Sequence, residues 1–275
     1  MSLDYSAIRC MLFVPGNRPD RFQKAVAASP DGVILDLEDA VGPGEKDAAR
    51  RQVGAFLAER AKGAPVLVRI NALGTPAALA DLLALADGSI RPDGLLLPKV
   101  EDRRDLDLVR ATLGSRLVPM LGLIETVRGL RHVDAIAEGF GADGAIAFGG
   151  ADLSAELGCD FAWEPLLLAR CRVVAAAAGA GIPAFDVPFL GIKDEAGLIA
   201  ETERVRALGF AAKLAIHPAQ VAPIAKAFSP SPEAVAAARR IVEAFEAATG
   251  EAIQVDGKMV DVPLYKSAQR TLKRA

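Results

Sequence analysis

The sequence is poor in the residues that build disulfide frameworks and histidine-rich metal centres. Among its 275 residues it has three cysteines, Cys10, Cys159 and Cys171, without a CxxC motif, and two histidines, His132 and His217. A sparse, odd number of cysteines is typical of a protein of the reducing cytosol and excludes a disulfide-rich fold or a cysteine zinc site. A metal centre in this chain would therefore use oxygen ligands.

Aromatic residues and excess basic charge are also scarce. Aromatic residues make up 5% of the chain, and 32 Lys and Arg against 35 Asp and Glu give a net charge of −3. There is no basic run and no set of aromatic side chains on which bases could stack, so nucleic acid is not an expected partner.

Long apolar segments are missing too. No apolar stretch reaches the ~18 residues that a membrane-spanning helix requires, and the first ten residues lack the pattern of a signal peptide. With 52% hydrophobic and 24% charged residues, the composition is that of a folded globular chain. We therefore expect a soluble, cytoplasmic protein with no membrane partner.

Short apolar runs recur along the chain, and most are followed by a segment with apolar residues at helical spacing. Runs of this kind are typical of parallel strands that are buried on both faces. Eight alternations predict an α/β fold, a (β/α)8 TIM barrel; the alternative is an open doubly wound sheet. The first run continues as VPGNRP without a GxGxxG motif, which disfavours a dinucleotide-binding sheet. The predicted strands cover residues 10–15, 32–37, 65–70, 94–99, 117–124, 144–148, 182–187 and 212–216.

The end of the chain departs from this repeat. The pattern predicts a helix ending at Gly250, a hairpin around Asp256-Gly257 and a last helix over 263–275. We therefore expect a barrel catalytic domain, residues 1–228, and a short C-terminal helical and hairpin extension, residues 229–275. The extension is too short for its own core and is expected to pack on its own barrel or on a neighbouring subunit. The predicted barrel helices cover 20–28, 44–60, 75–87, 101–113, 129–139, 164–180 and 194–208.

Two carboxylates follow neighbouring predicted strands. In α/β barrels the chemistry lies at the carboxyl ends of the strands, and Glu125 and Asp152 follow the fifth and sixth. Two carboxylates that face one cleft repel each other unless one is protonated or both share a cation. Oxygen ligands of this kind suit Mg²⁺. The alternative is that both carboxylates only stabilise the starts of the following helices.

Charged residues also end the second, third and fourth predicted strands. Arg69 could grip a carboxylate or stabilise an enolate oxygen, or it could form an internal ion pair with Glu38 or Asp39. The acidic stretch that contains them, Asp36-Leu37-Glu38-Asp39, is expected to orient Arg69 or metal-bound water. Lys99 has the chemistry of a Schiff-base lysine, but the surrounding carboxylates favour a protonated ion-pair partner.

Weaker signals come from short local patterns. The Gly149-Gly150 step precedes a helix start, where backbone N–H groups could meet an anion; the alternative is an ordinary turn. On its own, Lys24 is typical of a solvated helix face, and His217 before a proline is typical of a turn that ends a strand. Asp261 before Val262-Pro263 is typical of a helix N-cap.

Longer motifs provide a more specific signal. In order, RCMLFVPGNRPDRF, VILDLEDAV, VRIN, LLLPKVE, GLIET, FGGADLS and LAIHPAQV span about Arg9 to Gln220, and GKMVDVPLYKSAQ continues into the tail. Together they resemble the citrate lyase beta-subunit-like family, which includes malyl-CoA and citramalyl-CoA lyases within the HpcH/HpaI aldolase superfamily. The resemblance implies a TIM barrel, Mg²⁺ as cofactor and a homo-oligomer, often a trimer or hexamer.

The resemblance also implies roles for individual residues. Glu125 and Asp152 match the family's metal ligands, and Arg69 matches its substrate arginine. Asp261 matches a catalytic acid/base that a neighbouring subunit contributes. The implied acyl-CoA contacts are Phe13, Lys24, Ile216 and His217, and the implied keto-acid contacts are the backbone N–H groups near Gly150 and Ala151.

The implied reaction is the Mg²⁺-dependent cleavage, or formation, of a carbon–carbon bond. The substrate would be a 3-hydroxy-3-carboxyacyl thioester such as malyl-CoA, citramalyl-CoA or a citryl thioester, and the products a 2-keto acid and an acyl-CoA. The alternatives are a thioesterase (malyl-CoA hydrolase) on the same scaffold, a class II aldolase without CoA, and the beta subunit of a citrate lyase complex. Because the chain keeps the segment with Asp261, a self-sufficient CoA-thioester enzyme is favoured.

Overall fold

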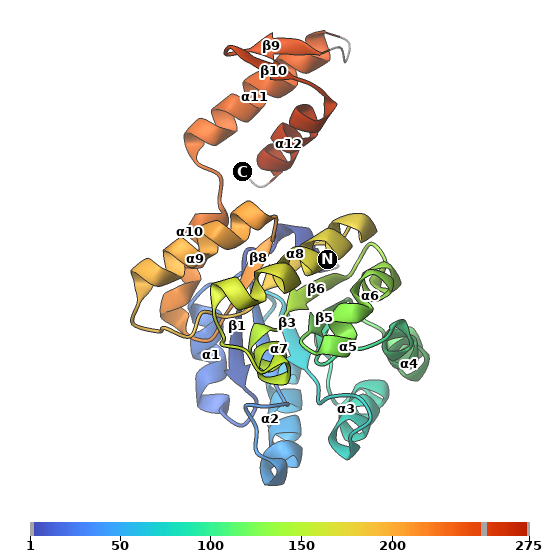
Figure 1. Ribbon diagram of the computed structural model, residues 1–275. Helices are drawn as coiled ribbons and strands as arrows, with labels where there is room; N and C mark the ends of the chain where they lie inside the picture. The colour runs from blue at the N-terminus through green and yellow to red at the C-terminus, as the bar shows by residue number, and fades with distance from the viewer. Residues whose placement is uncertain (1–2, 249–251, 274–275) are drawn as a thin grey trace. The chain divides into compact units, whose positions relative to one another are not determined.

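The structure, a computed structural model, describes residues 3–248 and 252–273. The chain divides into two compact units, Met1–Ala225 and Lys226–Ala275, and each is held together by contacts within itself. Figure 1 shows the ribbon of both. Within the described ranges, no helix is both long enough and apolar enough to cross a bilayer.

The first unit contains a closed barrel, as predicted. Within residues 3–225, eight parallel strands pair in chain order and the eighth pairs with the first. Closure excludes the open sheet, and each strand lies inside one of the predicted apolar runs. The strands are β1 (Cys10–Pro15), β2 (Gly32–Asp36), β3 (Val66–Arg69), β4 (Gly94–Leu97), β5 (Met120–Ile124), β6 (Ala145–Phe148), β7 (Ala184–Asp186) and β8 (Ala212–Ala215).

Apolar side chains fill the barrel interior and close its amino-terminal end. Met11, Ile34 and Leu67 are typical members of this buried cluster. Tyr5, in the short 3-10 turn η1 (Tyr5–Ala7), belongs to the same cluster, and its hydroxyl donates to the carbonyl of Pro119 just before β5 (3.3 Å). The amino-terminal end is thus plugged by the chain itself, which leaves the carboxyl end for chemistry.

Helices surround the strands, as Figure 1 shows. Their starts follow local capping rules. Thr75 is an example, because its hydroxyl accepts from the Ala78 N–H (3.1 Å) and Pro76 occupies the first helical position. The helices are α1 (Pro19–Ala27), α2 (Lys46–Glu59), α3 (Pro76–Asp87), α4 (Arg103–Leu113), α5 (Val127–Arg131), α6 (Val133–Phe140), α7 (Gly150–Leu157), α8 (Trp163–Ala180) and α9 (Glu195–Leu208), with 3-10 turns η2 (Pro43–Glu45), η3 (Gly114–Arg116) and η4 (Pro218–Gln220).

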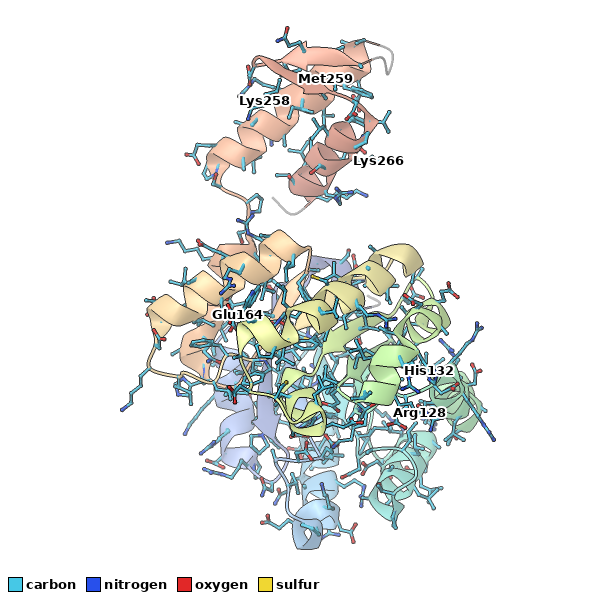
Figure 2. All side chains as sticks on the ribbon, in the orientation of Figure 1. Arg128, His132, Glu164, Lys258, Met259 and Lys266 are labelled. Atoms are coloured by element: carbon cyan, nitrogen blue, oxygen red, sulfur yellow. The ribbon has the colours of Figure 1, made fainter. Side chains whose placement is uncertain are left out.

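Three helices differ from the prediction, and one of them, Val221–Phe228, was simply absent from it. The expected helix 129–139 is split into α5 and α6 at His132, labelled in Figure 2, whose Nδ1 lies 2.9 Å from the Glu101 carbonyl oxygen. The short helix α7 was absent from the predicted set; it begins at Gly150, directly after β6, and covers only eight residues. A helix this short carries too few turns for a clear apolar period.

The second unit is a small helical and hairpin structure. The predicted turn is present, with left-handed backbone at Asp256 (φ 49°) and Gly257 (φ 77°). Phe245 stacks on Tyr265 with 4.7 Å between ring centroids, which packs its two long helices together. Gly250, the predicted helix end, and residues 274–275 lie outside the described residues. The elements are α10 (Val221–Phe228), which crosses the boundary between the units, α11 (Pro232–Ala247), β9 (Ile253–Val255), β10 (Lys258–Val260) and α12 (Val262–Lys273).

Candidate active site

A pocket of about 480 Å³ lies at the carboxyl ends of the barrel strands. Its wall combines acidic residues and one strand-end arginine with apolar side chains, the composition expected of a site that orients a small charged ligand. The lining residues are Phe13, Pro15, Arg21, Asp36, Asp39, Ala40, Arg69, Leu123, Glu125, Phe148, Gly149, Ala151, Asp152, Val187, Pro188, Leu190, Leu214 and Ile216.

Glu125 is a buried carboxylate at the end of β5. Its Oε1 accepts a hydrogen bond from the backbone N–H of Lys99 (2.8 Å). It lies close to the turn after β6, because a Cβ on Gly149 would be only 2.8 Å from its Oε2. Burial, and then the charges of Glu38 and Asp152, raise the pKa of Glu125 to about 8. The carboxylate is therefore costly to ionise unless a cation is nearby.

Asp152 lies in the first turn of α7 and lines the same pocket. Neither it nor Glu125 accepts a capping hydrogen bond in the described structure. The cap of α5 is Thr126, whose hydroxyl accepts from the Gly129 N–H (2.9 Å), and α7 begins after Gly149 without a side-chain cap. Helix capping therefore does not explain why the carboxylates of Glu125 and Asp152 face the same pocket.

The donor set fits a magnesium ion. In residues 3–248 and 252–273 there is no group of three or more His, Cys, Asp or Glu side chains that could hold a metal. The protein would therefore supply two carboxylates, Glu125 and Asp152, and leave the other positions to water and substrate. Mg²⁺ binds proteins in this manner, through one or two carboxylates. The mutual repulsion of the two carboxylates is a second reason for a cation between them.

Arg69 is held by Asp36, the first residue of the acidic DLED stretch that was expected to orient it. Its Nε and Nη2 donate to the two oxygens of Asp36 (2.7 and 2.6 Å), while Nη1 lies 3.1 Å from Oε2 of Glu38. The guanidinium also lies over the ring of Phe13, 5.0 Å from its centroid. Burial would lower the pKa of Arg69, but the bonds to Asp36 and the nearby carboxylates outweigh it and raise that pKa. Arg69 is a fixed cation in the pocket wall.

Lys99 links the remaining acidic residues. Its ammonium donates to Oε1 of Glu38 (2.7 Å) and lies 3.7 Å from Asp39 and 3.5 Å from Asp152. Burial alone would lower the pKa of Lys99, but the hydrogen bond to Glu38 and the charges of neighbouring carboxylates raise it above the usual value. The geometry favours the ion-pair role over a Schiff-base lysine, because the amine stays protonated.

Comparisons with known proteins show the family of this chain. The profile of the HpcH/HpaI aldolase/citrate lyase family matches residues 9–218. The chain belongs to this family. It is 32% identical to human mitochondrial citramalyl-CoA lyase, over 98% of this chain and 86% of the relative. It is 36% identical to a (3S)-malyl-CoA thioesterase of Cereibacter sphaeroides, over 97% of this chain and 94% of that protein.

A solved structure also matches nearly the whole chain. The protein CitE from Mycobacterium tuberculosis, in complex with magnesium, acetoacetate and coenzyme A, is 34% identical with a TM-score of 0.83. The match covers 98% of this chain and 99% of that one. The TIM barrel, with its helical extension, is thus a fold that a family member shares.

The other residues expected from the family resemblance lie at different distances from the pocket. Phe13, Ala151 and Ile216 line it. Gly150 is buried beside Ala151 in the first turn of α7. Their roles as substrate contacts stay predictions.

Lys24 and His217 lie outside the pocket wall. Lys24 is exposed on α1. His217 is exposed after β8, where its Nδ1 accepts from the Ala219 N–H (3.2 Å) and so forms the expected turn. Arg21, which the sequence analysis missed, lines the pocket. It lies three residues before Lys24 on the same helix, a spacing that places both on one face and that could have identified it.

Asp261 belongs to the second unit, between β10 and α12. Its Oδ1 accepts from the Leu264 N–H (3.3 Å) and its carbonyl accepts from the Tyr265 N–H (2.9 Å), so it occupies the helix-cap position. Exposed apolar side chains flank it, Met259 (labelled in Figure 2), Val262 and Leu264. Its catalytic role stays a prediction.

Proposed function

We propose that this chain is a Mg²⁺-dependent carbon–carbon lyase. It cleaves, or forms, a 3-hydroxy-3-carboxyacyl-CoA thioester such as malyl-CoA or citramalyl-CoA, with a 2-keto acid and an acyl-CoA on the other side of the reaction. The observation that carries the proposal is the convergence of Glu125, Asp152 and Arg69 on one pocket. The citramalyl-CoA lyase relative and the CitE complex with magnesium, acetoacetate and coenzyme A support it.

The keto-acid half of the substrate would bind between β5 and α7. Glu125 and Asp152 would hold the Mg²⁺, which supplies a template and Lewis acid for the oxygens of the keto acid. The first N–H groups of α7, near Gly150 and Ala151, have no acceptor within the helix and are suited to a carboxylate.

The acyl-CoA half would bind near Arg69. When the carbon–carbon bond breaks, the substrate hydroxyl gives its proton to water and becomes the carbonyl of the keto acid. The electron pair of the broken bond moves to the acyl carbon, and negative charge develops on the thioester oxygen. Arg69, fixed by Asp36, is suited to stabilise this enolate, an effect of about 3–4 kcal/mol for one well-aimed donor. Phe13, Lys24, Ile216 and His217, together with Arg21, would contact the CoA moiety.

Asp261 would transfer the proton. It would donate a proton to the enolate carbon after cleavage and remove it in the direction of synthesis. We propose that the extension brings Asp261 to the pocket of a neighbouring subunit in a homo-oligomer, a trimer or hexamer. The exposed apolar side chains of Met259, Val262 and Leu264 support a docking role for this segment.

A thioesterase is the second candidate function. The (3S)-malyl-CoA thioesterase relative favours it, because its identity to this chain is as high as that of the lyase. In that reaction water attacks the thioester carbonyl, and free CoA leaves while the carbon–carbon bond stays intact.

Product analysis separates the candidates. The purified chain is incubated with malyl-CoA and citramalyl-CoA, with and without Mg²⁺. A lyase releases glyoxylate or pyruvate together with acetyl-CoA, and a thioesterase releases free malate or citramalate and CoA. Cleavage of free hydroxy-keto acids alone would indicate a class II aldolase. Inactivity on every CoA ester would indicate a citrate lyase subunit that needs an acyl-carrier partner.

A further inference from the structure

Lys99 contacts both carboxylates to which the proposed function assigns the metal. Its backbone N–H donates to Glu125 Oε1 (2.8 Å), and its Nζ lies 3.5 Å from Asp152 Oδ2. The same ammonium donates to Glu38 (2.7 Å) and lies 3.7 Å from Asp39. Lys99, which follows β4, thus joins acidic groups from the ends of β2 and β5 and from α7.

The backbone of Lys99 is held in an unusual conformation. Its φ is +48°, in the left-handed region that disfavours residues with a Cβ. This conformation accompanies the N–H bond to Glu125. Glycine would adopt it without strain, so what the lysine adds at this position is its ammonium and the contacts that it makes.

The charges around the pocket show what that ammonium does. Five carboxylates gather there, those of Asp36, Glu38, Asp39, Glu125 and Asp152. In the described part of the chain, the cations that form ion pairs with them are Arg69, which is engaged by Asp36 and Glu38, and Lys99. Arg21 also lines the pocket, so five acidic groups face three basic ones. A substrate that carries a carboxylate would approach against this excess of negative charge.

We infer that Lys99 is a positioning residue that sets the charge balance between the metal and the anionic substrate. Its backbone fixes Glu125, and its ammonium competes with a divalent cation for Asp152 while it lowers the repulsion of the keto acid. The inference rests on the proposed function. It has a specific consequence: removal of the ammonium tightens the binding of Mg²⁺ and weakens the binding of an anionic ligand.

The test compares Lys99→Met with Lys99→Arg. Lys99→Met removes the charge but keeps the backbone N–H and an unbranched side chain only one atom shorter, and Lys99→Arg keeps the charge. Isothermal titration gives the Kd for Mg²⁺ alone and the Kd for oxalate at saturating Mg²⁺. In Lys99→Met we expect Mg²⁺ to bind at least about fivefold more tightly and oxalate at least about tenfold more weakly, as loss of one nearby unit charge predicts. Lys99→Arg should stay within about twofold of the wild type.

Other results overturn the inference. If both ligands bind more weakly in Lys99→Met, Lys99 only supports the structure, and if neither affinity changes, its charge is irrelevant. Lys99→Gly, which suits the left-handed backbone, provides the same comparison if Lys99→Met does not fold. Wild type and Asp152→Asn separate the two proposals: if the wild type binds no Mg²⁺, or Asp152→Asn binds it equally well, the proposed function itself fails.

Discussion

Asp36 and Arg69 are register partners on β2 and β3, and their side chains form two hydrogen bonds, of 2.7 and 2.6 Å. The two residues end adjacent parallel strands, so the barrel itself sets the direction of the guanidinium. Asp36 is 2% and Arg69 12% exposed, and in such surroundings a two-point ion pair fixes orientation strongly. The arginine expected to contact substrate is thus aimed by a residue at the neighbouring strand end.

Asp36→Asn should therefore impair catalysis as well as stability. It leaves Arg69 with less compensation for its buried charge and with a weaker anchor. We expect the free energy of unfolding to fall by about 3 kcal/mol. We also expect kcat/KM on the preferred CoA thioester to fall about 100-fold, which is the effect of misplacing one hydrogen-bond donor to the developing negative charge. Chemical denaturation and steady-state kinetics provide the two measurements. If Asp36→Asn keeps the kcat/KM of the wild type, Asp36 does not orient a catalytic group.

Gly149 leaves the space that Glu125 occupies. A Cβ at position 149 would lie 2.3 Å from the Cβ of Glu125, closer than two such atoms approach. Gly149→Ala should therefore displace the carboxylate and weaken Mg²⁺ binding by about tenfold or more, measured by calorimetry.

Gly179→Ala is the matched control for this substitution. Gly179 lies near the end of α8 with open space around its added Cβ. This change should leave Mg²⁺ affinity unchanged and raise stability by up to about 1 kcal/mol, because alanine favours a helix. Equal Mg²⁺ affinity in the two variants would argue against a tight fit around Glu125.

Much of this arrangement could be predicted from the sequence. Each of the eight strands lies inside an apolar run, because burial on both faces requires apolar residues throughout. The charged residues at the strand ends followed from the same pattern, since a break in such a run marks the end of the strand. Local patterns of this kind were enough to place Glu125 and Asp152 on neighbouring elements.

Features that depend on long-range geometry were not predictable in this way. Asp36, rather than Glu38 or Asp39, forms the two-point pair with Arg69 because of the β2–β3 register, which no local pattern encodes. At the break between α5 and α6, His132 contacts the Glu101 carbonyl, 31 residues away, which no local pattern indicates. Lys99 was predicted as an ion-pair partner, but the bond from its backbone to Glu125 required the left-handed turn.

The raised pKa of Glu125 predicts how the stability of the metal-free protein depends on pH. The folded protein keeps this proton up to about pH 8, whereas the ordinary pKa of a glutamate is 4.5. Between these values the folded state binds more protons than the unfolded state, so the free energy of unfolding falls as pH rises from about 5 to about 8.

Glu125→Gln, which has no proton to lose at this position, provides the comparison. Its free energy of unfolding, measured by urea denaturation in EDTA, should exceed that of the wild type by an amount that grows up to about pH 8. A difference that is constant across this pH range would contradict the assigned pKa shift.

Asp261→Asn tests the proposed proton transfer. The amide oxygen of asparagine can still accept the Leu264 N–H, so the fold should be retained. We expect turnover to fall by at least about 100-fold, while the Kd values for Mg²⁺ and oxalate stay unchanged.

Asp256→Asn makes the same chemical change in the same extension. Asp256 pairs with Arg240 at the hairpin turn (2.8 Å), and asparagine tolerates its left-handed backbone. This variant should keep nearly full activity. Wild-type turnover in Asp261→Asn would leave Asp261 as a helix cap without a catalytic role.

The central claim is that Glu125 and Asp152 jointly hold a divalent ion against the keto-acid part of the substrate. A crystal structure with Mg²⁺ and oxalate tests it most directly. The account predicts one ion ligated by an oxygen of each carboxylate, with oxalate completing the site beside the first turn of α7. An ion bound elsewhere, or the two side chains pointing apart with nothing between them, would contradict it.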